Sequence, residues 1–297
     1  MKEEVYKELL EQVKTKEGLE IDMSYDEYAS YIEILKEKIN YTDNVYNHSE
    51  ENQVLFTLTE IATLVWGLFG LATVDFFEQK DDSYIGVIFH SMTTQISNNL
   101  LSILILCNNS LDMQSGIMIR STCELCYTLL VVLVNDDKRK KYVEAGQTGN
   151  ELKIWNEEFK FNQLNEELKN FEASLTKNNK YVKKQLTFHR KNIYRHYSEY
   201  THSSFLSCWI NSYEYNDSNP SYYNIWGEKS SRVKKYLTSI NELNLFTFLD
   251  LFNFIVKNIE IKKYVGKDDL KQKLWNHAGY MFFIFREYYV KNISLIN

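Results

Sequence analysis

Apolar residues recur at intervals of three and four along most of the chain, which is the period of an amphipathic α-helix. The segment 229–264 has the clearest pattern, with one continuous apolar stripe formed by Val233, Tyr236, Leu237, Ile240, Leu243, Leu251, Phe254, Ile255 and Ile259. No alternation of apolar and polar residues of comparable length predicts a β-strand. The pattern therefore predicts an all-α protein.

Turn residues interrupt this periodicity and divide the chain into separate helices. The predicted helices span 2–15, 24–40, 48–78, 84–108, 112–135, 137–146, 150–175, 181–211, 229–264 and 268–292. We expect a multi-helix bundle of about ten helices. The chain forms a single all-α domain over 1–297, or two helical lobes, 1–146 and 147–297, divided at the turn near Gly146.

Composition supports a large helical core, because 44% of the residues are hydrophobic and only one is proline. The most apolar stretch, Ile61 to Val74, is shorter than the roughly 20 residues that span a bilayer. It predicts a buried core helix. The N-terminus, MKEEVYKELLEQ, is charged throughout and predicts no signal peptide. We therefore expect a cytoplasmic protein without a membrane partner.

The cysteines and glycines point to no metal or cofactor. Cys107, Cys123, Cys126 and Cys208 lie in apolar or helical contexts that suit reduced thiols. Cys123 and Cys126 form a lone CxxC without a second pair or suitably spaced histidines. There is no Gly-rich phosphate loop and no Ser-His-Asp pattern. The sequence predicts neither a metal site nor a bound cofactor.

One window of the chain is basic although the net charge is −6. Residues 173–198 contain no Asp or Glu, and aromatic residues alternate with the cations. Cations neutralise phosphates, and aromatic faces stack on unpaired bases. We predict RNA binding by Lys183, Lys184, Arg190 and Lys191, with a solvated helix face as the alternative.

The same predicted helix, 181–211, carries two pairs in which His follows Arg after five or six residues: Arg190 with His196, and Arg195 with His202. With about 100° per residue, His189 and His196 fall within about 60° of the apolar position Ile193. These histidines therefore belong to the edge of the core.

Arg195 and His202 lie roughly opposite Ile193, at about 180–200°. Their face continues into Leu206 and Trp209. A face that changes from basic to apolar predicts a covered surface such as a subunit interface, so we expect a homodimer.

This arrangement resembles the HEPN superfamily of helical ribonucleases and nucleotide-binding proteins. Its members carry Arg, a polar residue, several more residues and then His on one helix. His196 stands here at the polar position, where Asn is more usual. The resemblance covers roughly residues 112–297. The layout is also similar to helical proteins of bacterial phage-defence loci, which implies a toxin or abortive-infection effector with a neutralising or activating protein partner.

The resemblance implies a metal-independent endoribonuclease in which two copies of the motif meet across a dimer. His202 can transfer a proton near neutral pH, and Arg195 can hold two phosphate oxygens. Together they would promote attack of an RNA 2′-hydroxyl on its own phosphate. Supporting roles are predicted for Arg120, Glu124, Ser198, Glu199 and His196.

Arg120 and Glu124 lie four residues apart in a segment that is apolar on nearly every side. They form either a buried structural pair or part of a polar cavity shared with Arg195 and His202. The alternative to catalysis is a non-catalytic helical partner that binds protein or nucleotide. A hydrolase using Glu124 and a histidine is a third hypothesis.

Overall fold

The structure is a computed structural model that describes residues 1–19, 21–38, 49–73, 84–109, 111–175, 180–201, 213–216, 221–224, 232–257 and 259–296. Helices dominate it, and the prediction of an all-α multi-helix bundle is confirmed. The elements in chain order are α1 (Glu3–Glu17), α2 (Tyr25–Lys38), α3 (Glu50–Ala72), α4 (Ile85–Asn108), α5 (Asp112–Val134), α6 (Asp136–Thr148), α7 (Glu151–Glu158), α8 (Phe161–Leu175), α9 (Lys180–Thr201), β1 (Tyr213–Asn216), β2 (Ser221–Asn224), α11 (Val233–Lys257), the 3-10 helix η2 (Ile259–Tyr264), α12 (Asp269–Lys291) and α13 (Ile293–Ile296).

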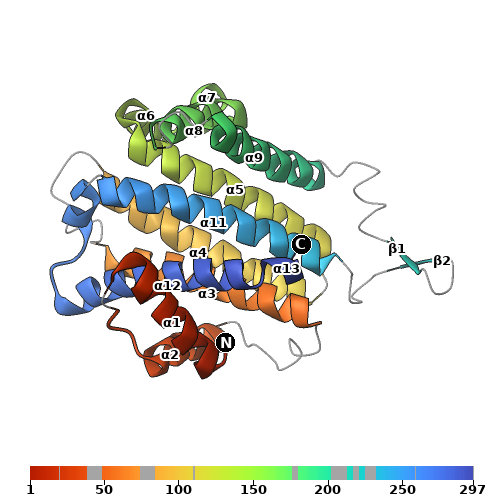
Figure 1. The fold of residues 1–297 in the computed structure, drawn as a ribbon. Helices are drawn as coiled ribbons and strands as arrows, with labels where there is room; N and C mark the ends of the chain where they lie inside the picture. The colour runs from red at the N-terminus through yellow and green to blue at the C-terminus, as the bar shows by residue number, and fades with distance from the viewer. Residues whose placement is uncertain are drawn as a thin grey trace.

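The long helices pack in layers around α3 (Figure 1). Helix α3 contacts α4 and α12 most extensively, α4 continues onto α5, and α11 packs on both α3 and α5. Helices α8 and α9 cover the outer side of α5, and α1 packs on α12 at the opposite side of the bundle. This order places α9, which carries the predicted motif, on an outer layer rather than at the centre.

Helix α3 is the most deeply buried element. Ser49 caps its start by accepting a 3.4 Å hydrogen bond from the Asn52 backbone N–H. By length and composition, α3 and the Gln114–Val134 part of α5 could each span a membrane. In the bundle, 78% and 61% of the residues in their most apolar windows are buried. The apolar side chains around Ile61 therefore form the core, as the sequence predicts.

Buried polar side chains link α3 to α11 within this core. Thr59 Oγ1 donates to Asn241 Oδ1 at 3.2 Å, and Asn241 Nδ2 donates to the Leu55 carbonyl at 3.0 Å. About one turn further along α11 and two turns further along α3, Trp66 Nε1 donates to Asn244 Oδ1 at 2.8 Å. Because buried polar groups are costly without partners, these bonds define which residues of the two helices face each other.

The turn near Gly146 does not divide the chain into separately packed lobes. Gly146 lies inside α6, and the helix ends at Thr148 before a left-handed Gly149. Helices α11 and α12, from the second half of the chain, pack directly on α3 from the first half. One hydrophobic core therefore includes residues from both halves.

Two predicted helices differ from the observed elements. The segment 150–175 divides into α7 and α8, because Phe159 turns inward between them and is 1% exposed. Its ring packs edge-on against Tyr142 at 5.7 Å and stacks on Trp155 at 5.7 Å. The segment 229–264 divides into α11 and η2.

A short antiparallel hairpin follows the motif helix. Strands β1 and β2 pair with Tyr213 opposite Asn224 and Asn216 opposite Ser221. Each strand has only four residues, which is too short for alternation to be read in the sequence. The letters between them, Asp-Ser-Asn-Pro, are typical turn residues and could have indicated a hairpin.

Candidate functional site

Helix α9 has a buried face and an exposed face at helical spacing. Arg190, Ile193 and Tyr197 are buried and form the inner face. Phe188, Lys191, Asn192 and Arg195 are exposed and form the outer stripe. The predicted orientation is therefore confirmed for Ile193, which faces the core, and for Arg195, which faces outward.

The predicted histidine partner of Arg195 cannot be placed, since His202 lies outside the described residues together with Leu206 and Trp209. The side chains of Lys183, Lys184 and Glu199 also lie outside the description. His189 and His196 are half-buried, as expected for the core edge. The His189 ring lies 4.9 Å from Phe246, and the His196 ring lies 4.8 Å from Tyr197.

The structure joins three of the predicted supporting residues at the contact between α5 and α9. Arg120 Nη2 lies 2.9 Å from Glu124 Oε1 on the same helix. Arg120 Nε donates to Ser198 Oγ of α9 at 3.2 Å, and Arg120 Nη2 also donates to the Tyr194 hydroxyl. We call Arg120, Glu124, Tyr194 and Ser198 the α5–α9 cluster.

Tyr194 lies between two flat groups. Its ring stacks on Phe161 of α8, with centroids 3.8 Å apart and planes 14° from parallel. The guanidinium carbon of Arg120 lies 3.5 Å from the Tyr194 ring centroid, a cation–π contact. Burial raises the pKa of the Tyr194 hydroxyl. The hydroxyl therefore stays protonated at neutral pH and can donate to Glu124 Oε1, 3.5 Å away.

The α5–α9 cluster is only partly shielded from solvent. The Arg120 side chain is 12% exposed and the Glu124 side chain 32%. Arg120 Nη1 has no hydrogen-bond partner among the described residues, although the atom is buried. An arginine held on one side, with donors left over on the other, can bind an anion such as phosphate.

The sequence leaves two hypotheses for Arg120 and Glu124: a buried structural pair, or part of a polar cavity shared with Arg195 and His202. The two residues do form an ion pair, and it is partly rather than fully buried. Arg before Glu is the weaker order for an exposed helical pair. Here two side chains of α9, Ser198 and Tyr194, also accept hydrogen bonds from Arg120. His202, the residue that the second hypothesis places beside this pair, lies outside the described residues.

Arg190 has a different role from the one the sequence suggests. Both Arg190 Nη atoms donate to the carboxylate of Glu172 on α8, with a distance of 2.9 Å from Nη2 to Oε2. Arg190 Nε donates to Asn165 Oδ1 at 3.2 Å. Arg190 is 6% exposed and Glu172 is 0% exposed. The prediction that Arg190 binds RNA is therefore wrong, because its donors are used inside the protein.

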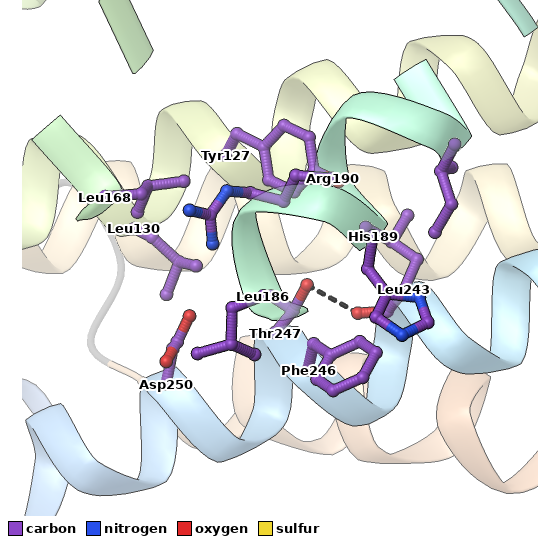
Figure 2. A pocket seen from close by; sticks show the side chains of 11 residues that line it. Tyr127, Leu130, Leu168, Leu186, His189, Arg190, Leu243, Phe246, Thr247 and Asp250 are labelled. Atoms are coloured by element: carbon purple, nitrogen blue, oxygen red, sulfur yellow. Dashed lines mark hydrogen bonds between the residues drawn. The ribbon is translucent and has the colours of Figure 1, made fainter. Parts of the chain in front are cut away.

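A second carboxyl group completes this buried cluster. Asp250 of α11 is hydrogen bonded to Glu172, and burial raises the pKa of Asp250 well above its usual range, with Glu172 adding to the rise. Figure 2 shows Asp250 and Arg190 at one end of a small cavity and His189 beside Phe246 at the other. The cavity volume is about 10 Å³, room for roughly one water molecule.

The described cysteines have no reactive character. Cys107, Cys123 and Cys126 are all buried. Burial raises the pKa of Cys126 to about 12 and that of Cys123 well above its usual value. Among the described residues, no group of three or more His, Cys, Asp or Glu side chains could hold a metal ion.

Two contributors to the α5–α9 cluster were not recognised as site residues in the sequence. Tyr194 is one of the aromatic residues of the basic window 173–198, and Phe161 lies outside that window. Tyr194 precedes Ser198 by four residues, so both lie on one helix face. That spacing could have indicated Tyr194. Phe161 lies on another helix, and no local pattern links it to Tyr194.

Comparisons with known proteins give no assignment. No family model matches the chain, and neither a curated protein nor a solved structure matches it.

Proposed function

We propose that this protein is a metal-independent endoribonuclease whose phosphate-binding group is Arg120, assisted by Arg195, and whose acid–base group is His202. The observation that carries the proposal is the α5–α9 cluster. Arg120 is fixed by Glu124, Tyr194 and Ser198, and its Nη1 has no partner among the described residues. The HEPN resemblance of the motif helix supplies the reaction type.

The chemistry is a transfer within the RNA chain. The 2′-hydroxyl attacks the adjacent phosphorus and loses its proton to a base, while the bond to the 5′-oxygen of the next nucleotide breaks. The products are a 2′,3′-cyclic phosphate and a 5′-hydroxyl. Guanidinium donors aimed at the phosphate oxygens would stabilise the charge that develops there. Histidine suits the proton transfers because it titrates near neutral pH.

The sequence spacing supports His202 as the acid–base group. His202 follows Ser198 by four residues and Tyr194 by eight. On a continuing helix, such positions share one side, about 40–80° apart around the axis. A homodimer that brings two such sites together would supply the second acid–base group. An effector role in phage defence, controlled by a protein partner, is part of the same proposal.

The test is cleavage of a labelled RNA series with single 2′-deoxy substitutions, with and without EDTA. We expect cleavage to stop only at the deoxy position and to continue in EDTA. Arg120→Lys keeps the charge but loses the fork of donors, so we expect a loss of about 100-fold or more. His202→Ala should abolish cleavage.

The matched control is Lys153→Ala on α7, which removes an exposed cation outside the α5–α9 cluster. It should cleave like the wild type. Circular dichroism of each variant checks that the helices remain. Cleavage that requires magnesium, or that ignores the 2′-deoxy group, refutes the mechanism. If wild-type protein cleaves no RNA, the non-catalytic partner role replaces it.

A further inference from the structure

The outer stripe of α9 combines an aromatic ring, two cations and an amide. Phe188 is 58% exposed, and Lys191, Asn192 and Arg195 are exposed with it. The positions follow the sequence i, i+3, i+4, i+7, so they form one row along the helix. Among the exposed large hydrophobic side chains of the described residues, Phe188 is the aromatic one.

The other aromatic rings described on α9 are occupied. Tyr194 lies between Phe161 and Arg120, and Tyr197 is fully buried. Phe188 therefore differs from them, since most of its surface is open to a ligand. Among the described residues, its ring contact is an edge-on one with the neighbouring His189, at 6.3 Å.

The charge of the stripe favours an anionic ligand. Lys191 and Arg195 lie in the window 173–198, which lacks Asp and Glu in a chain of net charge −6. The distance along α9 from position 188 to position 195 is about 10 Å. A few nucleotides of one strand cover that length. The row also leads toward Ser198, where α9 meets Arg120.

An exposed aromatic ring beside two cations favours single-stranded over double-stranded nucleic acid. A base can lie flat on Phe188 only if it is free of its neighbours, and duplex bases are already stacked and paired. We propose that the outer stripe binds a single-stranded RNA segment, with one unpaired base stacked on Phe188 and flanking phosphates beside Lys191 and Arg195. This proposal rests on the proposed ribonuclease function and specifies its substrate as unpaired RNA.

The test is fluorescence anisotropy with a labelled 2′-O-methyl RNA, which cannot supply the nucleophile, as a single strand and as a duplex. The wild type should bind the single strand more tightly. Phe188→Ala should weaken that binding about 5- to 150-fold, the range expected for one stacked base. Phe188→Trp should restore it, whereas Phe188→Leu should not, because leucine is apolar but cannot stack.

The control is Leu152→Ala on α7, which removes an exposed apolar side chain away from the stripe and should leave affinity unchanged. Arg195→Ala should lower the salt dependence of binding, as loss of a phosphate contact does. Equal binding by Phe188→Ala and wild type, or a preference for the duplex, overturns the proposal for the stripe. If wild type binds the single strand through Phe188 but cleaves no unmodified RNA, only the ribonuclease function fails. No RNA binding at all overturns both.

Discussion

The protein contains two arginine–glutamate clusters that use the same chemical groups in opposite ways. Around Arg190, Glu172 binds two guanidinium nitrogens and Asn165 binds the third, with almost no exposed surface. Around Arg120, Glu124 is about one-third exposed and one nitrogen has no partner among the described residues. The first cluster is closed. The second is open at Glu124, although the unused Arg120 nitrogen is itself buried.

The Arg190 cluster therefore has a structural role, whereas the Arg120 cluster is the candidate functional site. A guanidinium whose donors are all used joins helices, here α9 to α8, and has nothing left for a ligand. A guanidinium that is held firmly but incompletely keeps donors for a phosphate without first having to become ordered. Measurements on the two clusters should therefore give opposite patterns of stability and activity.

The largest expected effect is on stability at the closed cluster. Arg190→Ala should lower the free energy of unfolding by about 3–5 kcal/mol, because it leaves the buried Glu172 carboxylate without its partner. Arg120→Ala should cost less, because water can reach Glu124. Urea unfolding followed by circular dichroism measures both. Equal losses for the two variants would contradict the distinction between closed and open clusters.

A smaller effect is expected at the hydroxyl of Tyr194. Tyr194→Phe keeps the ring between Phe161 and Arg120 but removes the hydrogen bond from Arg120. We expect a stability loss of about 1 kcal/mol. A double-mutant cycle with Arg120→Lys should give a coupling energy of at least about 0.5 kcal/mol. Strictly additive stability losses in the two variants would show that the contact between Arg120 and Tyr194 contributes no coupling energy.

The smallest expected effect is a pH dependence at Asp250. Because folding raises the pKa of Asp250, the folded protein holds this proton more tightly than the unfolded chain does. The contribution of this group to the free energy of unfolding is thus fully present below the usual Asp pKa of about 3.9. It is lost as the pH rises toward the pKa of Asp250 in the folded protein. Asp250→Asn removes this decline while keeping a donor for Glu172.

We expect the melting temperature of Asp250→Asn to equal or exceed that of the wild type at neutral and higher pH. Thermal melts from pH 5 to pH 9 provide the measurement. The control is Glu157→Gln on α7, which neutralises an exposed carboxyl group outside the buried cluster. A parallel pH profile for Asp250→Asn and wild type would show that Asp250 does not carry the proton.

Helix positions could be predicted from the sequence because helical periodicity is local. The stripe around Leu237 and Ile240 identifies α11 without knowledge of its neighbours. The break at Phe159 could not be predicted in this way, since that ring leaves the helix to pack against Tyr142. The hairpin was missed because its strands are too short to show a period.

The candidate site was predictable in part. Arg120 and Glu124 were recognisable as charges in an apolar helix, but their contacts with Tyr194 depend on how α5 and α9 pack. The misassignment of Arg190 has a specific cause. The acid-free window begins one residue after Glu172, so the partner of Arg190 was just outside it. Helix geometry also places Arg190 only about 60° from Ile193, on the core side.

The buried hydrogen bonds between α3 and α11 limit how this protein can move. Sliding one helix past the other by a turn, about 5.4 Å, would separate Asn241 from Thr59 and Asn244 from Trp66. Each buried group left alone costs about 1–3 kcal/mol. Shear between these two helices is therefore opposed, whereas α8 and α9 form an outer layer that packs mainly on α5 and less extensively on α11. Any displacement that opens a path to Arg120 is expected in that outer layer, with α3 and α11 as its fixed base.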